Sequence, residues 1–162
     1  MNYYEIYKDK TILITGGAGA IGSNLSRKLA EAGAAKVIIL DDLSASYVWN
    51  IPNLTNVLFV EGSITSDIDL KRVFHEKPNY IFHLAAFFAN QNSVDYPEKD
   101  LLVSQLGTIK ILEHSVLQGG IKRFVYAGSG CAIYGAQAPL PLKEDFISMH
   151  LSTPYQISKM AG

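Results

Sequence analysis

The stretch TGGAGAIG at residues 15–22 decides the fold of this chain. It follows residues 11–14, a short apolar run whose β-branched residues and glycine boundary predict a buried strand. Residues 21–29 have apolar side chains at helical spacing, and Gly33 follows as a helix stop. A strand, a glycine turn and a helix in this order are typical of a phosphate-binding unit.

The glycines of this turn have separate roles. Gly16 allows a tight turn without a Cβ clash, Gly19 lets the backbone approach a pyrophosphate, and Gly22 lets the helix pack close to the sheet. The N-terminus of the helix offers unpaired N–H groups and a partial positive charge to the anion. An ordinary strand-to-helix turn can carry the same glycines, so their spacing alone leaves both interpretations open.

The next predicted strand favours a dinucleotide site. Residues 36–40 are apolar and are followed by Asp41, about twenty residues after the last glycine of the turn. An acidic side chain at this distance meets the ribose hydroxyls of the adenosine. A carboxylate accepts hydrogen bonds from these hydroxyls and repels a 2′-phosphate, so the sequence predicts NAD rather than NADP.

Composition limits the classes of protein that this chain can represent. Its 162 residues are 48% hydrophobic and 18% charged, enough to bury one sizeable core. The net charge of −1 without a basic stripe argues against a nucleic-acid partner. No run has the ~20 apolar residues of a membrane span, and residues 1–10 lack the apolar core of a signal peptide. The single cysteine, Cys131, fits a reducing compartment, so we expect a cytoplasmic protein.

Strands and helices alternate along the rest of the chain. We expect strands at 57–61, 80–84 and 123–127, helices at 67–75, at 98–118 and from Tyr155 onward, a polar loop at 90–97 and a small-residue loop at 128–135. This order predicts an α/β fold with a doubly wound parallel sheet, the Rossmann fold. Its ligand would lie at the carboxyl ends of the strands. Small or acidic residues occupy those ends: Gly16, Asp41, Gly62, Ala85 and Gly128.

Two of these elements carry more specific expectations. The helix at 98–118 has Leu102, Leu106, Ile109 and Leu112 along one face. His83 lies inside the apolar strand at 80–84, where a packed and hydrogen-bonded histidine is favoured over a ligand-binding one.

Tyr155 and Lys159 form the candidate catalytic pair. At positions i and i+4 of a helix, the phenol and the ammonium lie on one face. A free tyrosine has a pKa of about 10 and is a poor base at neutral pH, but a neighbouring cation favours the phenolate. Tyr155 can then take a proton from a substrate hydroxyl while hydride leaves the same carbon. A solvated surface pair is the alternative, which the preceding dinucleotide motif disfavours.

Together these motifs resemble the extended short-chain dehydrogenase/reductase family, in its nucleotide-sugar epimerase/dehydratase branch. Besides the glycine turn and Asp41, the matching residues are His83-Leu84-Ala85-Ala86, Ser93-Val94 with Pro97, Gly107-Thr108, Ile133-Tyr134-Gly135 and Tyr155-Gln156-Ile157-Ser158-Lys159. They run from residue 11 to residue 159, nearly the whole chain. Their joint order is specific for the family but not for the substrate.

The resemblance implies a set of site residues. The implied catalytic residues are Tyr155, Lys159 and, as the hydroxyl partner, Ser129. The implied NAD-binding residues are Gly16, Gly19, Ala20, Ile21, Gly22, Asp41, Ser63, Ile64, Leu84, Ala85, Ala86, Tyr155 and Lys159. The resemblance also implies a UDP-sugar substrate and a homodimer when the protein is complete, and we expect no metal.

Three departures from the family pattern stand out. Ser63 occupies a position that is usually acidic and contacts adenine. Gly130 occupies a position that usually carries Ser or Thr, so Ser129 is the nearest hydroxyl and Cys131 a poorer substitute. Members of this branch are also considerably longer, with a C-terminal portion that binds the sugar nucleotide. We therefore expect residues 1–162 to be an incomplete NAD-binding Rossmann domain, truncated before that portion.

The resemblance leaves several functions open. An epimerase similar to UDP-glucose 4-epimerase is favoured, because residues 128–132 lack the Asp-Glu pair that dehydratases of this branch often carry. A 4,6-dehydratase or a decarboxylase of the same family is the alternative. A non-catalytic dinucleotide sensor or scaffold is the third possibility, for which Gly130 argues weakly and the intact Tyr155 and Lys159 pair argues against.

Overall fold

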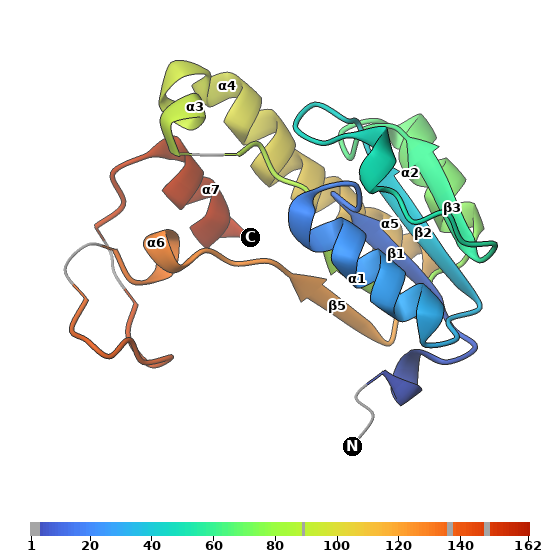
Figure 1. Cartoon of the computed structure of the whole chain (residues 1–162). Coiled ribbons are helices and arrows are strands. Elements are labelled where there is room, and N and C mark those ends of the chain that lie inside the picture. The colour runs from blue at the N-terminus through green and yellow to red at the C-terminus, as the bar shows by residue number, and fades with distance from the viewer. Residues whose placement is uncertain (1–3, 89, 136–137, 148–149) are drawn as a thin grey trace.

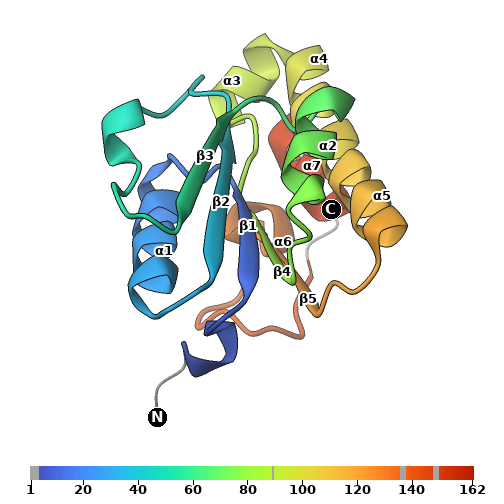
Figure 2. The same ribbon diagram turned by 90° about the vertical axis from the view of Figure 1, so that its right-hand side faces the viewer.

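Five parallel strands form the sheet at the centre of the molecule (Figures 1 and 2). They are β1 (Thr11–Thr15), β2 (Lys36–Asp41), β3 (Val57–Glu61), β4 (Tyr80–His83) and β5 (Arg123–Tyr126). Their order in the sheet is β3-β2-β1-β4-β5, so the direction of winding reverses between β1 and β4. The predicted doubly wound sheet is confirmed, and ligands of such folds bind at this reversal point.

The structure is a computed structural model that describes residues 4–88, 90–135, 138–147 and 150–162. Its longer helices are α1 (Ala20–Glu31), α2 (Asp67–His75), α5 (Gly107–Gln118) and α7 (Pro154–Ala161). The shorter helical elements are η1 (Glu5–Tyr7), η2 (Val48–Asn50), α3 (Asn90–Asp95), α4 (Pro97–Asp100), the π-helical segment η3 (Leu101–Leu106) and α6 (Gly130–Ile133). No helix in the described ranges combines the length and the apolar character needed to cross a bilayer.

Both faces of the sheet are covered. Figure 2 shows α1 on one face and α2 with α5 on the other. Along β1 the side chains alternate between two core clusters: Ile12 and Ile14 pack under α1, whereas Leu13 packs with α2 and α5. Successive side chains of a strand point to opposite faces, so a strand buried on both faces reads as a continuous apolar run. This is why residues 11–14 identify the central strand.

The expected polar loop at 90–97 is instead helical, and that prediction was wrong. Residues Asn90–Asp95 form α3, and Pro97 begins α4, where its missing N–H is harmless. The turn of α3 is supported by polar side chains: Gln91 Nε2 donates to Asp95 Oδ1 at 3.0 Å. Ser93 Oγ donates to the carbonyl oxygen of Asn90 at 2.6 Å. Local polar bonds of this kind stabilise a helix that hydrophobic periodicity does not indicate.

The helix expected at 98–118 is confirmed as the consecutive elements α4, η3 and α5, but its leucine-rich face lies outward. Leu102, Leu106, Ile109 and Leu112 are all exposed to solvent. The residues of α5 that are buried are Gly107, Thr108, Ile111 and Ser115. Small and hydroxyl side chains allow close packing here: a Cβ on Gly107 would lie 2.6 Å from Ile64 Cδ1.

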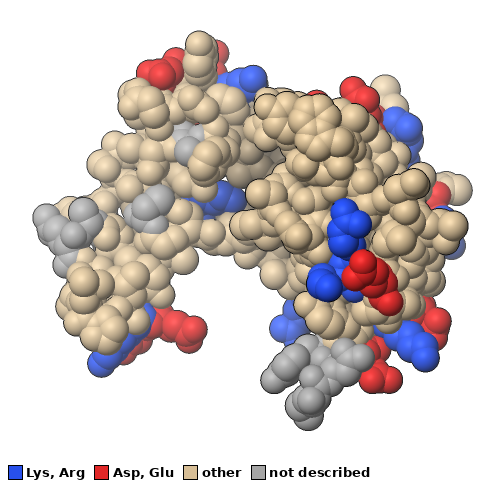
Figure 3. Space-filling model, in the orientation of Figure 1, with Lys and Arg blue, Asp and Glu red and all other residues tan. Residues whose placement is uncertain are grey.

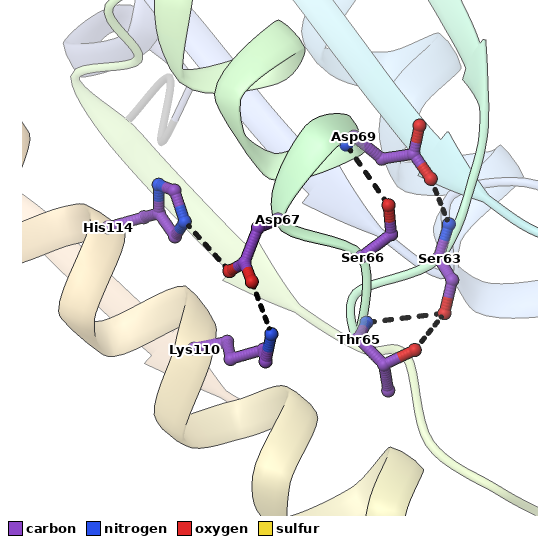
Figure 4. Close-up of polar contacts among 7 residues, drawn as sticks. All are labelled: Ser63, Thr65, Ser66, Asp67, Asp69, Lys110 and His114. Carbon is purple, nitrogen blue, oxygen red and sulfur yellow. Dashed lines mark hydrogen bonds and ion pairs between the residues drawn. The ribbon is translucent and has the colours of Figure 1, made fainter.

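Helices α2 and α5 are joined by charged side chains (Figure 4). Asp67 at the start of α2 accepts a hydrogen bond from Lys110 Nζ at 2.7 Å and lies 3.6 Å from His114 Nε2. Asp69 accepts the backbone N–H of Ser63 at 3.1 Å, while Ser66 caps the helix by accepting the N–H of Asp69. These contacts fix the turn after β3, which borders the site described next.

Candidate active site

A cavity of about 580 Å³ opens at the carboxyl ends of the strands. Helices α3, α4, α6 and α7 gather beyond one side of the sheet in Figure 1, and the surface in Figure 3 is hollowed between them and the rest of the molecule. The cavity is lined by every residue for which the sequence predicts a cofactor contact: Gly16, Gly19, Ala20, Ile21, Gly22, Asp41, Ser63, Ile64, Leu84, Ala85, Ala86, Tyr155 and Lys159. The structure therefore brings these residues to one place.

The glycine turn between β1 and α1 leaves no room for side chains. Gly16 has φ +70°, and a Cβ there would lie 2.8 Å from the backbone nitrogen of Ala85. A Cβ on Gly22 would lie 2.2 Å from the carbonyl oxygen of Gly16. Gly19 is the N-cap residue of α1, so the helix N-terminus points its free N–H groups into the turn. The turn thus has the shape and the donors of an anion cradle.

Asp41 at the end of β2 holds the turn and the following loop together. Its Oδ2 accepts the N–H of Ala18 at 2.9 Å, and its Oδ1 accepts the N–H of Leu43 at 3.0 Å and the hydroxyl of Ser46 at 2.7 Å. Asp42 instead accepts the N–H of Ser44 at 3.0 Å, a local turn contact. The carboxylate at the cavity is therefore fixed in orientation by three donors.

Ser63, where the family pattern is usually acidic, also borders the cavity. Its Oγ lies 2.9 Å from Thr65 Oγ1 and accepts the N–H of Thr65 at 3.2 Å (Figure 4). The carboxylate of Asp69 accepts the Ser63 N–H at 3.1 Å. A hydroxyl with these partners is a weaker hydrogen-bond acceptor for an adenine amine than a carboxylate would be.

His83 is a structural residue. It is completely buried, with Nδ1 2.6 Å from Thr15 Oγ1 and Nε2 2.9 Å from Thr108 Oγ1. Burial lowers the pKa of His83 to about 4, and the charge of Lys159 contributes in the same direction. A neutral imidazole bonded at both nitrogens confirms the packed histidine that the sequence favours.

Helix α7 presents the candidate catalytic pair. Thr153 caps it by accepting the N–H of Gln156, and the backbone N–H of Tyr155 donates to Ser93 Oγ at 3.0 Å. Tyr155 and Lys159, one helical turn apart, both line the cavity. The predicted helix from Tyr155 onward is therefore confirmed, and it places the phenol and the ammonium on one face.

Lys159 is held from several directions. It is 6% exposed, and its Nζ donates to the carbonyl oxygen of Ala127 at 3.0 Å and lies 4.7 Å from the ring centroid of Tyr126. Burial lowers the pKa of Lys159, and the negative charge of Asp100 opposes that shift. The ammonium is therefore fixed in a partly dry environment beside Tyr155, where its charge acts strongly.

Ser129 lies at the edge of this arrangement. It is the N-cap residue of α6 and follows Gly128, which lines the cavity; Ser129 is not among the described residues that do. Gly130 begins the short helix within the loop expected at 128–135. The side chain of Cys131 lies outside what the structure describes.

Sequence reasoning missed the part of the site that comes from α4 and η3. Lys99 and Val103 line the cavity together with Phe87 and Phe88, and Lys99 Nζ lies 5.1 Å from the ring centroid of Phe87. One signal was present in the sequence. The buried polar residues Asp100, Ser104, Thr108 and Ser115 recur at helical spacing, opposite the leucine-rich face.

Within the described ranges, no group of three or more His, Cys, Asp or Glu side chains is arranged to hold a metal ion.

Comparison with known proteins gives a consistent set of relatives. Residues 12–162 match the sequence model of the NAD dependent epimerase/dehydratase family. A UDP-glucose 4-epimerase of Mycolicibacterium smegmatis is 38% identical over 154 residues, which are 93% of this chain and 48% of that protein. The chain thus spans about half the length of the curated relatives it matches.

Solved structures agree with this fold. An epimerase of Methanothermobacter thermautotrophicus is 56% identical with a TM-score of 0.95, over 99% of this chain and 47% of that one. A UDP-glucose 4-epimerase of Thermotoga maritima, solved with UDP-glucose, is 39% identical with a TM-score of 0.86, over 93% of this chain and 48% of that one.

Proposed function

Because this chain belongs to the NAD-dependent epimerase/dehydratase family, we propose that its protein is an epimerase that acts on a nucleotide sugar with bound NAD. The proposal depends on one observation. Tyr155 and Lys159 line the same cavity as the glycine turn and Asp41. A dinucleotide-binding turn alone would fit many functions. A phenol and a buried ammonium at the other end of the same cavity fit proton transfer to and from a hydroxyl.

NAD is the cofactor of this family, and the residues present fit it. The N-terminus of α1, which follows the tight turn that Gly16 and Gly22 allow, suits a pyrophosphate. Asp41 suits the adenosine ribose of NAD and disfavours the extra phosphate of NADP. When bound, NAD supplies a reversible acceptor for the hydride of a sugar carbon.

The protein's own residues would handle the proton of that sugar carbon's hydroxyl. Tyr155 would take the proton as general base and return it later as general acid. Lys159 would stabilise the phenolate by its charge and bind the nicotinamide ribose. Ser129 is the proposed hydroxyl partner, since Gly130 has no side chain to fill that role. The support for this assignment is that Ser129 directly follows Gly128, which lines the cavity.

The substrate class proposed is a UDP-sugar. The support is that similar proteins are named UDP-glucose 4-epimerases and that one of them was solved with UDP-glucose. The experiment is product analysis after incubating the complete protein with UDP-glucose and NAD. Formation of UDP-galactose supports the epimerase. A 4-keto-6-deoxy sugar nucleotide would instead identify a dehydratase. Tight NAD binding without turnover of any UDP-sugar would favour the sensor or scaffold.

A decarboxylase of the same family would have a different substrate and product. Incubation with UDP-glucuronate would release carbon dioxide and leave a UDP-pentose. The missing Asp-Glu pair in residues 128–132 speaks against a dehydratase but not against this alternative. The two incubations therefore have to be run side by side.

We also propose that the complete protein is a homodimer, and that it is a cytoplasmic enzyme. The support is the exposed apolar face of α5, where Ile109, Leu112, Val116 and Leu117 line a shallow groove. Exposed apolar patches of this kind mark protein interfaces, and a second copy would bury the same face on both sides. Sedimentation of the complete protein tests this: Leu117→Glu should give monomers, whereas Ile68→Glu, at an exposed apolar position on α2, should not.

A further inference from the structure

A buried carboxylate lies behind the candidate catalytic pair. Asp100, the last residue of α4, has no exposed surface. Its Oδ2 accepts the hydroxyl of Ser158 at 2.5 Å, and its Oδ1 accepts the hydroxyl of Ser104 at 3.2 Å. A buried carboxylate is expensive unless its oxygens are bonded and its charge is compensated. Asp100 has hydroxyl partners at both oxygens, and Ser158 directly precedes Lys159.

These contacts attach α7 to α4 and η3. Gln105 Nε2 donates to Ser158 Oγ at 3.0 Å, so Asp100 of α4 and Gln105 of η3 both bond to the Ser158 hydroxyl. Ser104 Oγ in turn accepts the N–H of Phe87, a residue of the cavity wall. The segment that carries Ser104 and Gln105 is π-helical, a geometry that is frequent at functional sites. The position of α7 therefore depends on this cluster.

The charge of Asp100 also reaches Lys159. Among the described residues, the titratable groups that act on or contact Lys159 include Asp100 from α4, His83 from β4 and Tyr126 from β5, and Tyr155 lies one helical turn earlier on α7. The pKa of His83 is about 4, so this histidine is neutral near pH 7. Burial raises the pKa of Tyr126, with smaller contributions of the same sign from Tyr155 and Asp100, so this phenol is also neutral. Asp100 is thus the anion among these neighbours.

We propose that Asp100 is a positioning residue, which fixes α7 through Ser158 and supplies the counter-charge that keeps Lys159 protonated beside Tyr155. The assignment rests on the proposed function only in taking Tyr155 as the base. Its electrostatic part applies to the protein without substrate, because it concerns groups of the chain alone.

Removing the negative charge of Asp100 should change the pKa of Lys159 in a defined direction. In Asp100→Asn the side chain keeps its size and an acceptor for Ser158 but loses its negative charge. The pKa of Lys159, already lowered by burial, falls further, so Lys159 loses its proton at lower pH. If the protonated Lys159 is required for turnover, the alkaline limb of the pH profile of turnover should therefore move down.

The experiment measures the ionisation of Lys159 directly in the complete protein. The midpoint of Lys159 is titrated by NMR of its side-chain signals, identified by their absence in Lys159→Met, without substrate. Asp100→Asn should move the Lys159 midpoint downward by about one pH unit, the size expected for loss of a nearby opposite charge. Asp100→Glu, which retains the charge, should restore the midpoint. Ser158→Ala should reduce turnover while leaving the midpoint in place.

The possible outcomes distinguish the role of Asp100 from the proposed epimerase activity. An unchanged Lys159 midpoint in Asp100→Asn would overturn the role of Asp100, whatever the enzyme turns over. A lowered midpoint in a protein that converts no UDP-sugar would support Asp100 and count against the proposed epimerase. If Asp100→Asn does not fold, the smaller neutral variant Asp100→Ser takes its place, with circular dichroism as the check of folding. The same downward shift is then required.

Discussion

The imidazole of His83 joins two neighbouring strands: its Nδ1 lies 2.6 Å from Thr15 Oγ1, across 68 residues of sequence. Its other nitrogen contacts Thr108 on α5, so the ring connects β1, β4 and a helix of the second layer. Thr15 directly precedes the glycine turn, and its Oγ1 also accepts the N–H of Ala85 at 3.3 Å. A buried polar contact therefore supports the glycine turn and Ala85, which border the candidate site.

The neutral state of His83 predicts how stability depends on pH. An unfolded histidine binds its proton near pH 6.5, whereas the folded one does so only near pH 4. As the pH falls between these values, the unfolded state takes up a proton that the folded state excludes. The free energy of unfolding should therefore decrease, by about 3 kcal/mol in total from this group. Urea unfolding at a series of pH values measures the loss.

The histidine contribution is isolated by two variants. In His83→Gln the part of the pH dependence between pH 6.5 and 4 should disappear, although the protein starts less stable. His75→Gln, at an exposed position on α2, should keep the slope of the original protein. Equal slopes in His83→Gln and the original protein would contradict the assignment.

Gly22→Ala should destabilise the protein. The added Cβ would lie 2.2 Å from the carbonyl oxygen of Gly16, a backbone atom that cannot move aside cheaply. Overpacking of this kind costs about 1–3 kcal/mol, and the displaced turn should also weaken NAD binding. The matched control is Gly130→Ala, where the nearest atom is 3.8 Å from the new Cβ. If urea unfolding finds the two variants equally stable, the turn is less tightly packed than described.

Asp41→Ala should weaken NAD binding by about 1.5–3 kcal/mol, the range for a hydrogen bond to a charged group. The variant should also lose discrimination against NADP, because no carboxylate remains to repel the 2′-phosphate. Asp42→Ala is the control, since Asp42 accepts a local hydrogen bond from Ser44. Calorimetric titration with both dinucleotides checks this. Tighter binding of NADP than of NAD by the original protein would rule out the assignment.

The strands and the glycine turn could be predicted from sequence because their signals are local. A doubly buried strand is apolar throughout, as residues 11–14 show, and a glycine turn is required by its own backbone geometry. The spacing of Tyr155 and Lys159 likewise needs only one helix. These features depend on residues close together in the chain.

The rest depends on contacts between distant residues. The leucine-rich face of the helix at 98–118 could be predicted as one face but not as an exposed one, because the buried residues of α5 are Gly107, Thr108, Ile111 and Ser115. Asp100 is buried because Ser158, 58 residues away, bonds to it. Sequence periodicity marks a distinct face without saying which partner covers it.

Ser129→Ala tests the proposed hydroxyl partner of Tyr155. If Ser129 replaces the hydroxyl that Gly130 lacks, its loss should reduce turnover about 10–100-fold, the effect of one or two hydrogen bonds in the transition state. NAD affinity should stay the same, because the hydroxyl is assigned to the substrate. Undiminished turnover of UDP-sugar in this variant would remove Ser129 from the mechanism and leave Tyr155 and Lys159 in place.

The most direct test of the account is turnover of a UDP-sugar by Tyr155→Phe in the complete protein, with NAD affinity measured on the same sample. The substitution removes only the hydroxyl and leaves the ring to pack in α7. Turnover should fall by at least about 100-fold, as expected for loss of a general acid–base group, while NAD affinity is unchanged. Turnover close to that of the original protein would contradict the assignment of Tyr155 as the base and with it the proposed mechanism.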